Sequence, residues 1–192
     1  LKRGKNITDA IEEKLIQTAT RTRTWFNSDR AANSGWEFEA RKSLGFIGAF
    51  YKCFSITANY TRIQSTVEVY QTVGNSINTQ TQLTSRPMQG QSPYMLNLSF
   101  LFTEPSVGTS VSLLYNKFGR RLDAVGFLAS DIYEESRDLV DLAISQPVFL
   151  GLEAKFTVKN LNNSERLLTR DGVLYERTAT GKTYSIQLSQ TF

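Results

Sequence analysis

The sequence predicts an all-β protein in which about eight antiparallel strands form part of a transmembrane β-barrel. Three observations support this fold class. Apolar and polar residues alternate with a period of two in a series of segments, short and long connections follow one another between them, and the last segment alternates up to a terminal aromatic residue. Such alternation is typical of strands with unlike faces.

The last segment, residues 182–192, gives the clearest signal. Tyr184, Ile186, Leu188 and Phe192 share one face of an extended strand, and Ser, Gln and Thr residues share the other. In an outer-membrane barrel the apolar face meets lipid and the small polar residues face a wet lumen. Because terminal strands that end in Phe commonly direct barrel assembly, we expect these four residues to form an assembly signal. The alternative interpretation is an edge strand of a soluble β-sandwich.

The same alternation recurs along the chain, with large apolar residues on one face and Ser, Thr, Asn or charged residues on the other. In chain order the predicted strands cover residues 7–18, 36–46, 54–61, 94–103, 110–116, 140–145, 152–159 and 182–192. The first of these is the weakest. Helical periodicity extends over no long segment, so the pattern predicts strands throughout.

The predicted connections fall into two length classes. Short ones cover residues 48–52, 103–108 and 146–151, and long polar ones cover residues 64–92, 119–133 and 160–181. The two classes would therefore lie at opposite ends of the sheet. Outer-membrane barrels sort their connections in this way, with short periplasmic turns and long extracellular loops, whereas a soluble sandwich has no reason to do so.

The predicted polar faces carry several charged residues. The candidates for lumen-facing polar groups are Glu37, Glu39, Arg41, Asp141, Glu153, Lys155 and Lys159. Folding the two strands around the turn at 146–151 is expected to bring Asp141 diagonally across from Lys155 and Lys159. Two interpretations remain open at this stage: a lumen surface that contacts a solute or an internal plug, and an ion-pair network on a wet wall.

Composition excludes several function classes. The 192 residues include no histidine, which removes Ser-His-Asp and Cys-His nucleophilic systems and most catalytic zinc sites, so we expect no enzyme, cofactor or metal. The net charge of +4 is scattered, which argues against a nucleic-acid partner. No apolar run is long enough for a transmembrane helix, but strands need only about 10 residues. The acidic pairs Glu12-Glu13 and Glu134-Glu135 are interpreted as solvated loop or rim charge, and Cys53 as a passive residue.

Several segments resemble TonB-dependent receptors of the Bacteroidetes type. They are RPMQGQSPY at 86–94, GWEFEARKSL at 35–44, FSITANY at 54–60, and the stretches 114–126, 131–137 and 156–163. The resemblance implies an outer-membrane barrel of about 22 strands with a plug in its lumen. It implies that residues 1–192 are the carboxyl-terminal portion of that barrel domain, with the plug, the TonB box and the early strands absent.

The same resemblance implies a function and partners. The chain would belong to a receptor and transporter for TonB-dependent uptake of an iron chelate, vitamin, glycan or peptide, located in the bacterial outer membrane. Its partners would be outer-membrane lipid and lipopolysaccharide, the rest of the barrel and the plug, TonB through that plug and, in part of the family, a surface lipoprotein. Two alternatives stay open: a self-contained eight-stranded barrel that acts as an anchor or adhesin, and a soluble β-barrel or sandwich binding module.

Overall fold

A computed structural model describes residues 2–3, 7–17, 22–75, 78–126, 130–149 and 151–190, and within these ranges the protein is all-β. The strands are β1 (Lys2–Arg3), β2 (Ile7–Gln17), β3 (Thr22–Ser43), β4 (Phe54–Asn75), β5 (Asn78–Arg86), β6 (Tyr94–Thr103), β7 (Ser110–Phe118), β8 (Arg121–Gly126), β9 (Ile132–Glu134), β10 (Arg137–Pro147), β11 (Leu152–Lys159), β12 (Arg166–Arg170), β13 (Val173–Thr178) and β14 (Thr183–Gln190). Two short 3-10 helices, η1 (Leu44–Phe46) and η2 (Ala49–Cys53), join β3 to β4. In the described part of the chain, no helix is long and apolar enough to cross a membrane.

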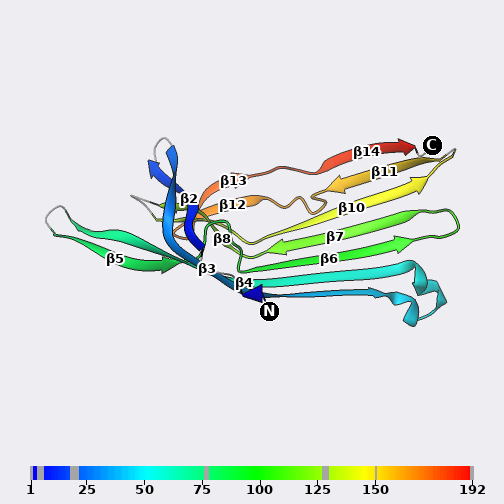
Figure 1. Cartoon of the computed structure of the whole chain (residues 1–192). Coiled ribbons are helices and arrows are strands. Elements are labelled where there is room, and N and C mark those ends of the chain that lie inside the picture. The colour runs from blue at the N-terminus through cyan, green and yellow to red at the C-terminus, as the bar shows by residue number, and fades with distance from the viewer. Residues whose placement is uncertain are drawn as a thin grey trace.

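One region of the molecule is a regular antiparallel sheet, which we call the turn-side sheet. It consists of residues 36–43 of β3, residues 54–63 of β4, and β6, β7, β10, β11 and β14, paired in that order. Its three short connections all lie at the same end (Figure 1). Two of them use a glycine in the left-handed region, Gly108 (φ 73°) and Gly151 (φ 74°), where a side chain would be strained. The predicted sorting of connections by length therefore holds at this end.

The other region consists of the loop-side strands: the remainder of β3 and β4 together with β2, β5, β8, β9, β12 and β13. β3 and β4, each 22 residues long, continue beyond the turn-side sheet, where β2 pairs with β3 and β5 pairs with β4. β8, β9, β12 and β13 form a small antiparallel group, and β8 joins β2 through a short parallel pairing. Figure 1 shows these strands at the end opposite the short turns.

The prediction of long polar loops is therefore wrong for much of the chain. The predicted loop 64–92 contains the second half of β4 and all of β5, and the predicted loops 119–133 and 160–181 contain β8 and β12–β13. Residues 64–84 of the first segment are rich in Thr and Val, whose branched side chains favour extended backbone even where the composition is polar. The eight predicted strands are all present, and the described residues hold six more.

Buried side chains gather on the loop side. Val67 and Val69 of β4 pack with Ala31 of β3, and Met88 covers them. A second cluster joins Ala124, Ile132 and Leu168 from β8, β9 and β12, with Tyr175 packed against it. The turn-side sheet is a single layer within the described residues, and Val158, 5% exposed, is the one apolar residue buried in it.

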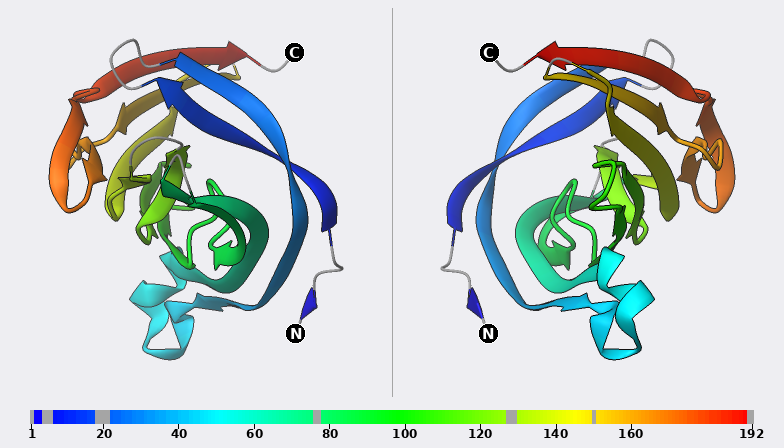
Figure 2. Two further views of the ribbon diagram at one scale, coloured as in Figure 1. Left: turned by 90° about the vertical axis from the view of Figure 1, so that its left-hand side faces the viewer. Right: turned by 90° about the vertical axis from the view of Figure 1, so that its right-hand side faces the viewer.

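The sheet curls when viewed along its strands (Figure 2), but it is not closed into a barrel. The strand order runs from β13 at one end to β14 at the other, and β14 pairs only with β11 among the described residues. Residues 36–43 of β3 likewise pair only with β4. The prediction of an antiparallel all-β fold is confirmed, and within the described residues the turn-side sheet has an unpaired strand edge on each side.

Candidate functional site

The register of the turn-side sheet assigns each residue to one of its two faces, because residues directly opposite each other on paired strands share a face. One row of opposed residues crosses six strands from β4 to β14: Phe54, Phe102, Val111, Ile144, Phe156 and Ile186. A second row on the same face contains Ile56, Phe100, Leu113, Leu142, Val158 and Tyr184. Every position in both rows is apolar or aromatic, so this face is a continuous apolar surface, here called the apolar face.

Half of the side chains in the two rows are exposed, and most of the others are half-buried. Leu98, Phe100 and Phe156 keep 38%, 37% and 38% of their surface accessible, and Ile186 keeps 75%. A soluble sandwich would bury Leu98, Phe100 and Phe156 in its core, and the described residues provide no second layer to do so. An exposed apolar surface of this extent indicates contact with a lipid or with another molecule.

The opposite face, here called the polar face, carries the residues that the sequence singled out. Glu39 lies opposite Asn59, which in turn lies opposite Asn97, so these three share one face. In the same way, Arg41 lies opposite Thr57 and Thr57 opposite Ser99. Following the register through β7, β10 and β11 assigns further residues to the same face. This face therefore carries all seven candidates: Glu37, Glu39, Arg41, Asp141, Glu153, Lys155 and Lys159. A hollow of about 320 Å³ lies against this face. The register thus places all seven on one face of the sheet, and their position in a lumen stays a prediction.

Amide side chains connect neighbouring strands across the polar face. The Asn59 amide donates to Glu37 Oε1 at 2.7 Å, and the Asn116 amide donates to Asn97 Oδ1 at 2.5 Å. The hollow touches Asn59, Asn97, Asn116 and Asp141. Hydrogen-bonded amides and carboxylates of this kind suit a surface in contact with water or with a polar solute, since both satisfy their remaining donors and acceptors.

The expected placement of Asp141 near both lysines is wrong for Lys155 but not for Lys159, which directly follows Val158, the register partner of Leu142. Lys155 lies opposite Ser145, four residues along β10 from Asp141, which at about 3.3 Å per residue is too far for an ion pair. Asp141 Oδ1 instead accepts a hydrogen bond from the Asn160 backbone N–H at 2.8 Å. Among the described residues, neither Lys155 nor Lys159 forms an ion pair with Asp141. The carboxylate fixes the end of β11 rather than joining a charge network.

The terminal strand places three of the four candidate signal residues together. Tyr184, Ile186 and Leu188 lie on the apolar face of β14, opposite Val158, Phe156 and Ala154. All eight residues of β14 are exposed. Phe192 lies outside the described residues. The role of this strand in assembly stays a prediction.

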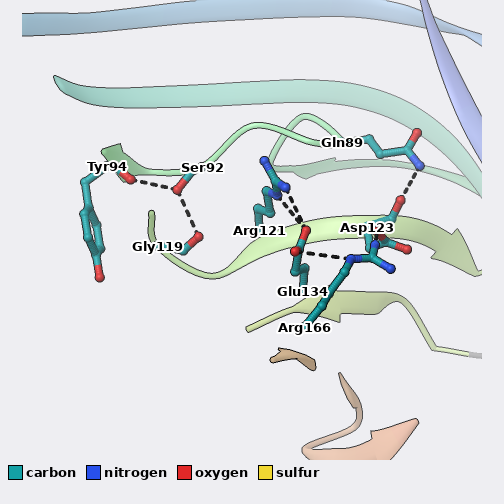
Figure 3. Close-up of polar contacts among 8 residues, drawn as sticks. All are labelled: Gln89, Ser92, Tyr94, Gly119, Arg121, Asp123, Glu134 and Arg166. Carbon is teal, nitrogen blue, oxygen red and sulfur yellow. Dashed lines mark hydrogen bonds and ion pairs between the residues drawn. The ribbon is translucent and has the colours of Figure 1, made fainter. Parts of the chain in front are cut away.

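Buried ion pairs hold the loop-side strands together, and the sequence did not reveal them. Glu134 of β9 accepts from Arg121 of β8 at 2.8 Å and from Arg166 of β12 at 3.2 Å, and Arg166 also reaches Asp123 (Figure 3). Glu134 is only 4% exposed, so its interpretation as solvated rim charge is wrong. Glu135, the residue after β9, contacts Arg120 and Thr169 instead.

A second buried pair lies between β2 and β5. Both carboxylate oxygens of Glu12 accept from the Arg86 guanidinium, at 2.8 and 2.6 Å, and Glu12 is 1% exposed. The interpretation of Glu12 as solvated charge is therefore also wrong. Such two-pronged pairs are strong because the planar guanidinium matches the carboxylate. Because the partners are 74 positions apart in sequence, no local sequence pattern indicates this ion pair.

The segment between β5 and β6 ties the two regions of the molecule together. The Gln89 side chain accepts from the Glu13 N–H at 2.6 Å and donates to the Asp123 carbonyl oxygen (Figure 3). Farther along, the buried Ser92 hydroxyl lies 2.8 and 2.9 Å from the carbonyl oxygens of Tyr94 and Gly119. This segment crosses from β2 and β8 to the start of β6, so it fixes the loop-side strands on the turn-side sheet.

No group of metal-ligating side chains occurs in the part of the chain that the structure describes. A hollow of about 340 Å³ lies between the loop-side strands and β4, with Arg62, Arg120, Arg121 and Tyr133 among its lining residues. The guanidinium groups of Arg120 and Arg121 are engaged by Glu135 and Glu134.

Comparison with protein-family models, with curated proteins and with solved structures gives no match for this chain. The class of protein is therefore inferred from the geometry of the two faces.

Proposed function

We propose that this chain forms part of the wall of an outer-membrane β-barrel that acts as a receptor and active transporter for a nutrient. The observation that carries the proposal is the pair of unbroken apolar rows on one face, which no second layer of the described residues covers, while the opposite face is polar and borders a hollow. Lipid would cover the apolar face, and the polar face would line the lumen. In a soluble β-protein the apolar face is instead buried in the core and the polar face meets water.

The two ends of the sheet would then face different compartments. The short turns would lie in the periplasm, and the loop-side strands, fixed by buried ion pairs, would extend outside the cell. Lumen residues such as Glu39 and Asp141 would contact the solute or an internal plug without covalent chemistry, so no enzymatic activity is expected. The resemblance of several segments to TonB-dependent receptors supports energy coupling through TonB, with the plug supplied by residues outside this chain.

The two unpaired strand edges support a larger barrel. A strand edge in contact with lipid leaves backbone N–H and C=O groups without partners, which costs several kcal/mol per group. Residues 36–43 of β3 and all of β14 present such edges within the described ranges. Further strands would pair there. The alternative is that the two edges pair with each other and close a small barrel that acts as an anchor or adhesin.

The test is extraction and mass measurement of the intact gene product from outer membranes. We expect it to resist alkaline extraction, to require detergent, and to have a mass several times the 21.7 kDa of this chain. A mass close to 21.7 kDa would favour the small barrel. A folded, monomeric product that stays in solution without detergent would overturn the membrane proposal altogether.

A further inference from the structure

The connection between β3 and β4 differs from the other short turns of the sheet. Residues 44–53 form η1 and η2 and present large apolar side chains to solvent, with Phe46 and Phe50 exposed by 70% and 72%. Figure 2 shows the two short helices projecting from the curled sheet. We call residues 44–53 the aromatic foot.

The aromatic foot is continuous with the apolar face. The Phe50 ring lies 5.5 Å from Tyr51 and 5.6 Å from Phe54, the first residue of β4. Phe54 in turn lies 4.8 Å from Phe102 and 5.5 Å from Phe100, both in the apolar rows. One chain of rings therefore runs from the tip of the foot onto the face that lipid is proposed to cover.

The charge of the foot and its flanks is entirely positive. Arg41, Lys42 and Lys52 lie within or beside it, and residues 41–54 include no acidic residue. Lys42 shares the apolar face, opposite Ile56, and its Nζ lies 5.4 Å from the centre of the Phe46 ring. The aliphatic part of Lys52 packs over Gly45, where a Cβ atom would lie 2.9 Å from Lys52 Cγ. Lys42 thus holds its charge over a ring of the foot and Lys52 packs its stem against the foot, and neither ammonium forms an ion pair among the described residues.

The other two turns at this end of the sheet also expose apolar residues. Val107 lies between β6 and β7, and Val148 and Phe149 lie between β10 and β11, all exposed. Figure 1 places all three connections at the same end. This end of the molecule is therefore suited to a boundary between hydrocarbon and water.

We infer that the aromatic foot binds anionic phospholipid in the leaflet nearest the short turns. Phe46 and Phe50 insert at the level of the headgroups, and Lys42 and Lys52 extend to the phosphates, as lysines do at membrane surfaces. Anionic lipid is the occupant because the foot is aromatic and purely basic, and each lysine near an anionic surface strengthens attachment by about fivefold. The inference rests on the proposed function, since it requires the apolar face to span the bilayer.

Fluorescence quenching in liposomes tests the position of the foot. Cysteine is placed at Phe50, at Ile186 on the apolar face, or at Gln187 on the polar face of the intact gene product, with Cys53 changed to serine, and is labelled with bimane. We expect lipid-attached quenchers to reach positions 50 and 186, and aqueous iodide to reach position 187. If iodide alone quenches position 50 while lipid-attached quenchers still reach position 186, the inferred lipid contact of the aromatic foot is wrong. The proposal that the sheet spans the membrane would then still stand. Failure of lipid quenchers at position 186 would instead overturn the proposed function.

Native mass spectrometry tests the choice of lipid. The protein in mixed micelles of phosphatidylglycerol and phosphatidylcholine is expected to retain phosphatidylglycerol preferentially, and the double variant Lys42→Gln/Lys52→Gln is expected to lose roughly 25-fold of that preference. The matched control is Lys155→Gln/Lys159→Gln, which removes two lysines from the polar face and should leave the preference unchanged. An equal loss in both variants, or an unchanged preference in the foot variant, would overturn the assignment.

Discussion

The turn-side sheet exposes large apolar side chains on one face, whereas the loop-side strands bury charged side chains against one another. Phe100 and Phe156 in the sheet have no protein layer over them in the described ranges, while Glu12 and Glu134 on the loop side are almost completely enclosed. The two regions therefore depend on different partners. Under the proposed function, lipid supplies the apolar environment of the sheet, whereas the loop-side strands enclose their charges in contacts of their own.

The largest loss of stability in the loop-side region is expected when one partner of its most buried ion pair is removed. Glu12→Gln leaves the Arg86 charge enclosed without a counter-charge, and we expect a loss of about 3–5 kcal/mol in the local free energy of unfolding. Pulse proteolysis of the detergent-solubilised gene product in urea measures this loss.

The control for this variant is an exposed pair in the same region. Arg30 and Glu68 lie 3.9 Å apart and are largely solvated, so Glu68→Gln should cost less than about 1 kcal/mol. Equal losses in the two variants would mean that burial of the Glu12–Arg86 pair does not stabilise the loop-side strands.

The turn-side sheet is tested by two adjacent leucines that differ only in the face they occupy. Leu113 lies in an apolar row and Leu114 lies opposite Asp141 on the polar face, with similar exposures of 40% and 44%. In a bilayer, Leu113→Arg should cost about 2–4 kcal/mol near the midplane, and Leu114→Arg should cost little because it faces the hollow and a carboxylate. The yield of membrane-inserted, urea-resistant protein measures the difference. Equal behaviour of the two variants would contradict a lipid-covered face.

A smaller loss of stability is expected from a substitution in the segment between β5 and β6, here called the seam, which joins the two regions. Ser92→Ala removes the hydroxyl that lies between the carbonyl oxygens of Tyr94 and Gly119, and we expect a loss of about 1 kcal/mol. Hydrogen exchange at the Ile63 amide, which donates to the Pro93 carbonyl oxygen, reports on opening of this seam. Ser99→Ala, on the polar face of β6, is the matched control and should leave that exchange rate unchanged.

The sequence predicted the turn-side sheet well because alternation is a local property. The sides of β3, β10 and β11 that carry Glu39, Asp141 and Lys155 follow from counting residues along each strand, and the register agrees. The partner of Asp141 could not be predicted in this way. That partner depends on the number of residues in the β10–β11 turn, and the observed register places Lys155 opposite Ser145.

The loop side could be predicted less well because its stabilising contacts join distant segments. Polar composition made residues 64–92 look like a loop, although β4 and β5 pair there along nine positions. Glu12 and Glu134 looked solvated because a charged residue is rarely buried unless it is paired, and their partners Arg86 and Arg166 are remote in sequence. Only the topology brings these charges together.

The smallest expected effect concerns an exposed ion pair at the outer edge of the loop-side strands. The Arg177 guanidinium hydrogen-bonds Glu165 and lowers the pKa of that carboxyl, and Glu165 in turn raises the pKa of Arg177. A lowered carboxyl pKa in the folded state means that the pair stabilises the protein above the ordinary glutamate pKa, and that this contribution disappears as the pH falls through the lowered value. In Arg177→Gln we expect the Glu165 pKa to rise towards its ordinary value, measured by NMR titration of the carboxyl carbon. Because water screens both groups, thermal stability near neutral pH should barely change. A large loss of stability would contradict this expectation. It would show that the β12–β13 hairpin depends on surface charge and not only on the buried ion pairs of Glu12 and Glu134.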